Sequence, residues 1–217
     1  MIEWITQIDH SILLFIQENL RFDGLTEALI SITHLGDHGK FWIILCLVLL
    51  LFKRTRKAGV CGLAALLINL LITNVTLKPL VARVRPYEQF EDLILLIGRQ
   101  KDFSFPSGHT SSSFATAVAI FMMDRRIKNI ADGITKSSAT VLGTASMILA
   151  VAIGYSRLYV GVHFPTDVLA GVVIGIFSAW AAGKLIHAAI GKWKLEAIFG
   201  MEREPAEAAL EVEAADE

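Results

Sequence analysis

Apolar runs separated by short charged stretches dominate the chain. After the first 36 residues, the longest runs cover 41–52, 58–77, 110–123, 139–155 and 166–190, and charged or polar residues border each of them. A helix needs about 20 apolar residues to cross the hydrocarbon of a bilayer, and several runs reach or approach that length. The pattern predicts an all-α fold: a multipass integral membrane helix bundle of five to six transmembrane helices.

The first 36 residues follow a different pattern. The apolar stretch 12–16 is short and charged residues follow it directly, while 25–32 places Thr26 and Glu27 among apolar residues. A single crossing through this region would bury those charges, which is energetically costly. We predict instead two short helices that lie at the membrane interface or form a re-entrant pair.

Composition and charge divide the chain into three parts. Hydrophobic residues make up 54% of the sequence and the mean hydropathy is +0.56, which is unusual for a soluble domain. Residues 201–217 hold seven acids and one arginine, so this end contributes −6 to a total charge of −1. We predict interfacial or re-entrant helices over 1–36, a transmembrane domain over 37–195 and an acidic, disordered tail over 196–217.

Lysine and arginine in the short loops indicate the orientation in the membrane. The loops at 53–57 and 125–136 and the segment after 190 are basic, which places them and the C-terminus in the cytoplasm. The loops 78–106 and 156–165 then lie outside. The first ten residues hold no lysine or arginine, which favours an outside N-terminus and five spans, with six spans and an inside N-terminus as the alternative. The aromatic residues expected at the interfaces are Trp42, Tyr87, Tyr155 and Tyr159 outside and Trp193 inside.

The two outer loops are basic as well, against the usual rule, and a demand for anion binding explains the conflict. They contain three polar stretches, Lys78–Pro86, Pro106–His109 and Ser156–Asp167. Arginine binds phosphate oxygens through two hydrogen bonds, lysine supplies a point charge, and the N-terminus of a helix favours an anion. These stretches predict a phosphate site at the outer membrane face.

Histidines at two positions suit proton transfer and nucleophilic attack. His163 and Asp167 are four residues apart at the start of an apolar helix, so the carboxylate can orient the imidazole. His109 stands where another helix begins and can exchange a proton near neutral pH. A single interfacial arginine is usually a snorkelling anchor and a lone loop histidine is usually structural, but their joint spacing on one face favours a site. We expect His163 to face solvent.

The spacing of these residues resembles a known family. Lys78-x6-Arg85-Pro86, Pro106-Ser107-Gly108-His109 and Ser156-Arg157-x5-His163-x3-Asp167 are similar to the three-part signature of the type-2 phosphatidic-acid phosphatases, a superfamily that includes the vanadium haloperoxidases. The resemblance covers about residues 40 to 190 and no signature position departs from it. It identifies 37–195 as a transmembrane phosphatase domain.

The resemblance implies a mechanism without metal or other cofactor. His163 would be the nucleophile that forms a phosphohistidine, Asp167 would orient it, and His109 would protonate the leaving group. The residues that would bind the phosphoryl group are Lys78, Arg85, Ser107, Gly108 and Arg157. His34 and His38 are four apart, but Gly36 lies between them, so a helical metal-ligand pair is not expected there.

The membrane setting narrows the substrate to a lipid phosphate or diphosphate. We expect undecaprenyl diphosphate by analogy with bacterial members, with phosphatidylglycerophosphate or phosphatidic acid as alternatives. A lipid phosphotransferase has the same site, and an anion channel or transporter is the alternative outside enzymes. We expect the loop 88–105, with its apolar segment 93–97, to contact the lipid tail, to close over the head group or to form a packed loop helix. The expected partners are the substrate and the bilayer, with no nucleic acid and with the oligomeric state open.

Overall fold

The computed structural model describes residues 3–130 and 136–193, and every regular element in those ranges is helical. The elements in chain order are α1 (Glu3–Asn19), α2 (Asp23–Leu35), η1 (Asp37–Gly39), α3 (Lys40–Leu51), α4 (Arg56–Asn69), η2 (Leu70–Leu77), α5 (Lys78–Val81), α6 (Pro86–Gln89), α7 (Gly108–Ile130), α8 (Lys136–Tyr159) and α9 (Pro165–Trp193). The all-α prediction is confirmed. The predicted acidic tail, 196–217, lies outside the described residues.

The helices extend beyond the apolar runs that predicted them. α7 begins at Gly108 and α8 continues to Tyr159, so His109 and Arg157 lie in helical turns rather than in loops. The run 58–77 corresponds to α4 and to the π-helix η2 that continues it. The N-terminal segment forms two helices with a break at residues 20–22, and their place at the membrane interface stays a prediction.

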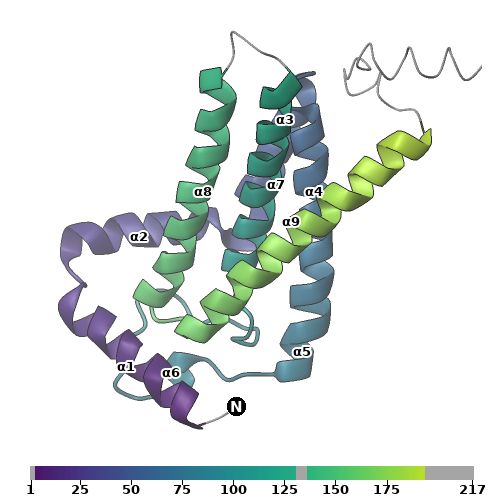
Figure 1. Ribbon diagram of the computed structural model, residues 1–217. Helices are drawn as coiled ribbons and strands as arrows, with labels where there is room; N and C mark the ends of the chain where they lie inside the picture. Colours follow the sequence, from purple (N-terminus) through teal and green to yellow (C-terminus); the bar gives the residue numbers. More distant parts are fainter. Residues whose placement is uncertain (1–2, 131–135, 194–217) are drawn as a thin grey trace, which may run out of the picture.

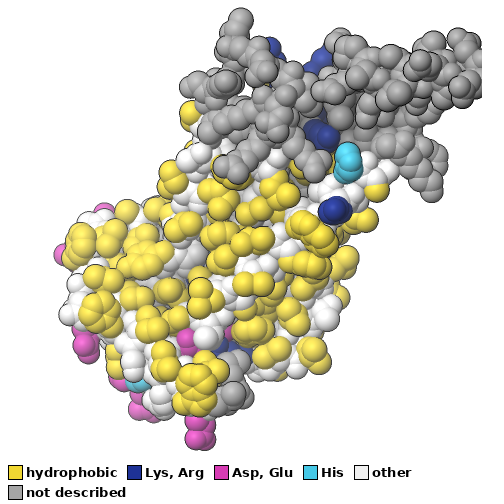
Figure 2. Space-filling view, viewed as in Figure 1, with side chains coloured by type: hydrophobic (Ala, Val, Ile, Leu, Met, Phe, Trp, Pro, Cys, Tyr) yellow, Lys and Arg dark blue, Asp and Glu magenta, His cyan; other side chains and the backbone are white. Residues whose placement is uncertain are grey.

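Three stretches of the described chain are long and apolar enough to cross a membrane: 56–89, 141–159 and 165–189. A fourth is added if α2 and the segment Asp37–Leu51, which meet at a bend of 47°, form one span. This criterion selects fewer helices than the five to six spans predicted, and that count remains a prediction. Hydrophobic side chains cover the outward faces of α8 and α9 in Figure 2, and Leu169 and Val173 are 64% and 67% exposed. Such a surface suits lipid.

The helix α7 lies at the centre of the bundle and packs against α4, α8 and α9 (Figure 1). Small buried residues on α7, including Ala115 and Ala119, allow this close packing. The contact with α9 is closest at Gly175, where a Cβ atom would lie 2.7 Å from the carbonyl oxygen of Ser111 and 2.9 Å from the nitrogen of Ala115. Because both are backbone atoms of α7, the two helices cannot accept a larger residue without moving apart.

Two of the predicted interfacial aromatic residues lie inside the protein instead. Trp42 is fully buried and its indole Nε1 donates to Ser113 Oγ at 2.9 Å. Tyr159 is also fully buried, and its hydroxyl lies 2.8 Å from Thr26 Oγ1. Their polar atoms find partners in α7 and α2, so both rings contribute to packing between helices rather than to a membrane belt. That part of the prediction is wrong.

The loops fall into two sets at opposite ends of the bundle (Figure 1). α3 ends and α4 begins at the upper end of the view, where α7 also ends and α8 begins. The start of α7, the end of α8 and the start of α9 lie together at the lower end, beside α5 and α6. The chain therefore brings its three polar signature stretches to one end, with α1 and α2 packed against the same region.

The close approach of α7 and α9 predicts a large difference between two identical substitutions on α9. Gly175→Ala places a methyl group against the α7 backbone and should destabilise the fold by about 1–3 kcal/mol. Gly183→Ala meets only the tip of Met123 at 3.8 Å, and the higher helix propensity of alanine should leave its stability unchanged or raised. Thermal unfolding in detergent measures both. Equal melting temperatures for the two variants would contradict the close packing.

Candidate active site

The signature residues from three separate stretches lie within one polar cluster. His163, in the turn between α8 and α9, has its Nε2 atom 3.4 Å from Arg85 Nη1. The N–H of Ser107, directly before α7, donates to the carbonyl of Asp167 at 3.1 Å and so joins α7 to α9. The structure thus brings together residues that are up to 89 positions apart, from Lys78 to Asp167.

His163 is buried, with only 1% of its surface exposed, so the expectation that it faces solvent is wrong. Its Nδ1 atom lies 3.5 Å from Asp167 Oδ2, one helical turn away, and makes no hydrogen bond. Burial, together with the charges of Arg85 and Arg157, holds the pKa of His163 well below its ordinary value. The imidazole is therefore neutral at pH 7, and its Nε2 lone pair is free of a proton when Nδ1 carries the hydrogen.

The Asp167 carboxylate is fixed by contacts that the sequence did not predict. Ser104 Oγ donates to Oδ2 at 2.5 Å and the Phe164 N–H donates to the same oxygen at 3.0 Å. Arg83 Nη1 donates to Oδ1 at 2.5 Å. Because this carboxylate is fully buried, each of these donors offsets its loss of hydration. Asp167 is therefore held in place independently of His163.

Arg83 connects the site to the first helix. Its Nη2 donates to Asp9 Oδ2 at 2.8 Å, and the Asp9 side chain, on α1, also accepts the N–H of Thr166 at 3.0 Å. The guanidinium stacks over Phe164, 3.8 Å from the ring centroid. Neither Arg83 nor Asp9 was among the site residues predicted from the sequence. An aspartate on the inward face of a helix, in register with Leu13 and Ile16, was the available signal.

Three cations, Lys78, Arg85 and Arg157, form what we call the cation cluster, and all three are buried. Arg85 Nη1 donates to the carbonyl of Val162 at 2.7 Å, and Arg157 Nη1 donates to Thr33 Oγ1 at 2.6 Å. Arg157 Nε has no hydrogen-bond partner. Buried charges of one sign repel each other, and an anion placed among them offsets this repulsion. The cation cluster is therefore suited to bind an anion.

In this structure the anion is a carboxylate of the same chain, that of Asp102. It contacts Lys78 Nζ and accepts a hydrogen bond from Arg85 Nη2 at 2.7 Å, while Arg85 Nε donates to its main-chain carbonyl at 2.9 Å. Burial would raise the pKa of Asp102, but the hydrogen bonds and charges of Lys78 and Arg85 outweigh it and lower that pKa to about 2. Asp102 is thus ionised and occupies a position that suits a phosphoryl oxygen.

The start of α7 contributes the other predicted residues. Ser107 is buried and its hydroxyl lies 2.9 Å from Thr110 Oγ1, while the backbone at Gly108 runs beside Lys78 Nζ. His109 lies at the edge of the cluster, with 17% of its side chain exposed. Its Nε2 atom lies 2.9 Å from Asp37 Oδ1, a residue of η1 that the sequence analysis did not consider.

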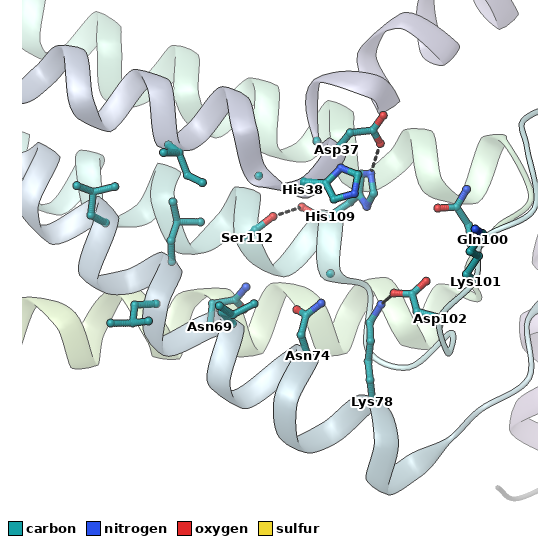
Figure 3. A pocket seen from close by; sticks show the side chains of 18 of the residues that line it. Asp37, His38, Asn69, Asn74, Lys78, Gln100, Lys101, Asp102, His109 and Ser112 are labelled. Atoms are coloured by element: carbon teal, nitrogen blue, oxygen red, sulfur yellow. Dashed lines mark hydrogen bonds and ion pairs between the residues drawn. The ribbon is translucent and has the colours of Figure 1, made fainter.

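A cavity of about 760 Å³ opens beside this cluster between α3, α4, η2 and α7 (Figure 3). One end is polar and includes Lys78, Asp102 and His109. The other end is apolar, with a wall formed by Ile43, Leu63, Leu66, Leu67 and Leu70. The cavity therefore has the two-part character that a lipid with a charged head group requires.

The loop before α7 is irregular rather than helical over 93–97. Leu95, Leu96 and Ile97 pack against a cluster that contains Tyr159 and Val160, and the Leu96 N–H donates to the Val160 carbonyl at 3.2 Å. The predicted loop helix is therefore absent from this segment. Within the described ranges, no group of three or more His, Cys, Asp or Glu side chains is placed to hold a metal ion.

Known proteins resemble this chain in sequence. A family model described as the PAP2 superfamily matches residues 58–190. An undecaprenyl-diphosphatase of Sulfolobus acidocaldarius is 34% identical over 134 residues, which cover 62% of this chain and 58% of that protein. The phosphatidylglycerophosphatase B of Bacillus subtilis is 33% identical over 162 residues, which cover 72% of this chain and 73% of that protein.

A solved structure resembles the fold. The crystal structure of a transmembrane PAP2-type phosphatidylglycerolphosphate phosphatase from Bacillus subtilis superposes with a TM-score of 0.70 at 26% identity. The match covers 86% of this chain and 88% of that one. The structural match therefore extends beyond residues 58–190, the part of the chain that matches the family model.

The contact of Asp102 with the cation cluster predicts the effect of removing its charge. In Asp102→Asn, an external phosphate ion no longer competes with a carboxylate for Lys78 and Arg85, so it should bind about tenfold more tightly. Competitive inhibition by inorganic phosphate or orthovanadate measures this. Glu91→Gln is the control, because Glu91 is an exposed acid in the same loop. An unchanged or weakened inhibition constant in Asp102→Asn would contradict the competition.

Proposed function

We infer the activity from one premise: this chain belongs to the PAP2 superfamily. We propose that it hydrolyses a lipid phosphate or diphosphate in the membrane. The observation that carries the proposal is the cation cluster, in which Lys78 and Arg85 converge on one carboxylate beside His163. A phosphoryl group in place of that carboxylate would meet positive charge and a histidine nucleophile at once.

The proposed reaction proceeds in two steps. Nε2 of His163 attacks phosphorus while the bond to the lipid oxygen breaks, and His109 gives that oxygen a proton as it leaves. The cation cluster and the backbone at the start of α7 stabilise the negative charge of the transition state. Water, activated by His109, then cleaves the phosphohistidine and releases phosphate. Asp167, 3.5 Å from Nδ1, keeps the attacking ring in its orientation.

We propose undecaprenyl diphosphate as the substrate. The apolar wall of the cavity, which contains Leu63, Leu66 and Leu67, suits an isoprenoid chain, and the polar end suits the diphosphate. The undecaprenyl-diphosphatase relative supports this choice. Phosphatidylglycerophosphate is the second candidate, because the relative and the solved structure from Bacillus subtilis are both named for it.

We also propose that the site faces the outside of the cell. The basic residues at 53–57 favour the cytoplasmic side for that end of the bundle, and the site lies at the opposite end. The C-terminus would then be cytoplasmic. A diphosphate exposed on the outer leaflet could enter this site sideways from the membrane through the cavity beside α3.

Replacement of His163 tests the proposed chemistry. His163→Asn should lower phosphate release by at least about a thousandfold, because the nucleophile is lost while the shape of the side chain is largely kept. The assay measures phosphate released from undecaprenyl diphosphate, phosphatidylglycerophosphate, phosphatidic acid and a soluble phosphate ester. His187→Asn is the matched control, since His187 is exposed on α9 and should tolerate the change.

A rapid-quench experiment with substrate labelled in the terminal phosphate supplies a direct readout. Acid-labile label should appear on the wild-type protein and be absent from His163→Asn. Full turnover by a folded His163→Asn variant would overturn the proposed mechanism. Transfer of label to a lipid or sugar acceptor without phosphate release would favour the phosphotransferase.

Chelation tests whether the cation cluster supplies the positive charge that a metal ion supplies in other phosphatases. With EDTA present, turnover should stay within about twofold of its original value, because lysine and arginine side chains supply the positive charge. The rate of phosphate release is compared before and after dialysis against the chelator. A loss of activity that a divalent ion restores would contradict the proposed mechanism.

A further inference from the structure

An aspartate outside the three signature stretches contacts His109. Asp37 Oδ1 lies 2.9 Å from His109 Nε2, and its other oxygen, Oδ2, lies 2.9 Å from Nδ1 of His34. Figure 3 shows Asp37 and His109 side by side at the polar end of the cavity. We propose that Asp37 is the positioning residue of His109: its carboxylate fixes the ring through Nε2 and leaves Nδ1 to serve the leaving group. The proposal rests on the proton-donor role given to His109 above.

The backbone around Asp37 is shaped to fit the histidine ring. A Cβ atom on Gly36 would lie only 2.6 Å from His109 Cδ2, so only glycine allows this approach. The next residues turn sharply, with φ of 54° at His38 and 66° at Gly39, both in the left-handed region. A non-glycine residue such as His38 adopts that region only at an energetic cost, which packing must offset. The turn thus presents a carboxylate to one edge of the ring.

The charges around His109 show why a carboxylate matters there. The groups that face the ring are Lys78 from α5, Arg157 from α8, His163 from the turn before α9 and Asp37 from η1, with His34 of α2 acting through Asp37. Burial first, and then the charges of Arg157 and Lys78, oppose a positive charge on the imidazole and lower the pKa of His109 to about 4. Asp37 is the anion in direct contact with it, and it therefore favours the protonated ring that a proton donor requires.

The step that depends on Asp37 is the departure of the leaving group. The P–O bond breaks as the bond to His163 forms, and its electron pair stays on the leaving oxygen. That oxygen takes a proton from Nδ1 of His109, while the Asp37 carboxylate keeps its hydrogen bond to Nε2. An alcohol is a poor leaving group without that proton, whereas a nitrophenolate leaves readily as an anion. The need for Asp37 should therefore follow the basicity of the leaving group.

The experiment compares two phosphate monoesters, phosphatidic acid and p-nitrophenyl phosphate, by kcat/KM, which reports on the step that cleaves the P–O bond. Asp37→Asn should lower kcat/KM for phosphatidic acid about 30-fold and that for p-nitrophenyl phosphate by less than about threefold. A purely structural role would lower both equally. Equal losses for the two substrates, or no loss for either, would overturn the proposal.

The matched control is Asp92→Asn, which breaks a second histidine–aspartate pair of the same length. His10 Nε2 lies 2.9 Å from Asp92 Oδ1, and the Asp92 side chain is about half exposed. The Asp92→Asn variant should hydrolyse both substrates at the wild-type rates. His109→Gln should show the same selectivity as Asp37→Asn, and the double variant should lose no more than His109→Gln alone. A fully additive double variant would count against the proposal.

A second measurement does not depend on turnover. In protein with ¹³C-labelled histidine, NMR in detergent follows the pH at which His109 takes up its proton. Removal of the carboxylate should move that pH about one unit lower in Asp37→Asn than in wild type. If the wild type releases phosphate from neither monoester and from no lipid of the panel above, the proposed function fails while this titration still tests the contact. An unchanged titration would overturn the role of Asp37.

Discussion

Buried positive charge at one end of an apolar bundle is the constraint that shapes this protein. Lys78, Arg83, Arg85 and Arg157 are each less than 9% exposed, and an uncompensated ion in such a place would be unstable. In the folded protein, carboxylates of the same chain lie against these cations. Asp9 and Asp167 both contact Arg83, and Asp102 contacts Lys78 and Arg85. We propose that a phosphoryl group takes the place of the Asp102 carboxylate in this balance of charges.

The compensating groups come from parts of the chain that carry no signature. Asp9 belongs to α1 and Asp37 to η1, and both precede residues 58–190, the part that matches the family model. Asp37 contacts His109 directly, whereas Asp9 contacts Arg83, which in turn contacts Asp167. The N-terminal helices thus help to shape the site.

Small residues let the helices approach closely enough to form the site. Gly175 brings α9 against α7, Gly171 lies against the Ser107 carbonyl, and Gly36 lies against the ring of His109. In each case a Cβ atom would come within 3.0 Å of an atom of the facing segment. The position of the α7 N-terminus between α8 and α9 therefore depends on the absence of side chains as much as on contacts.

The sequence by itself determined the helical class, the approximate bounds of the long helices and the identity of the residues in the cluster, because apolar runs and signature spacing are local properties of the chain. It could not give the burial of His163, the inward position of Trp42 or the partners Asp9, Asp37 and Asp102. Those contacts depend on which helices face each other. The sequence around a single aspartate does not indicate which cation it contacts in the folded protein. Only the tertiary structure decided these contacts, since packing brings together residues far apart in the chain.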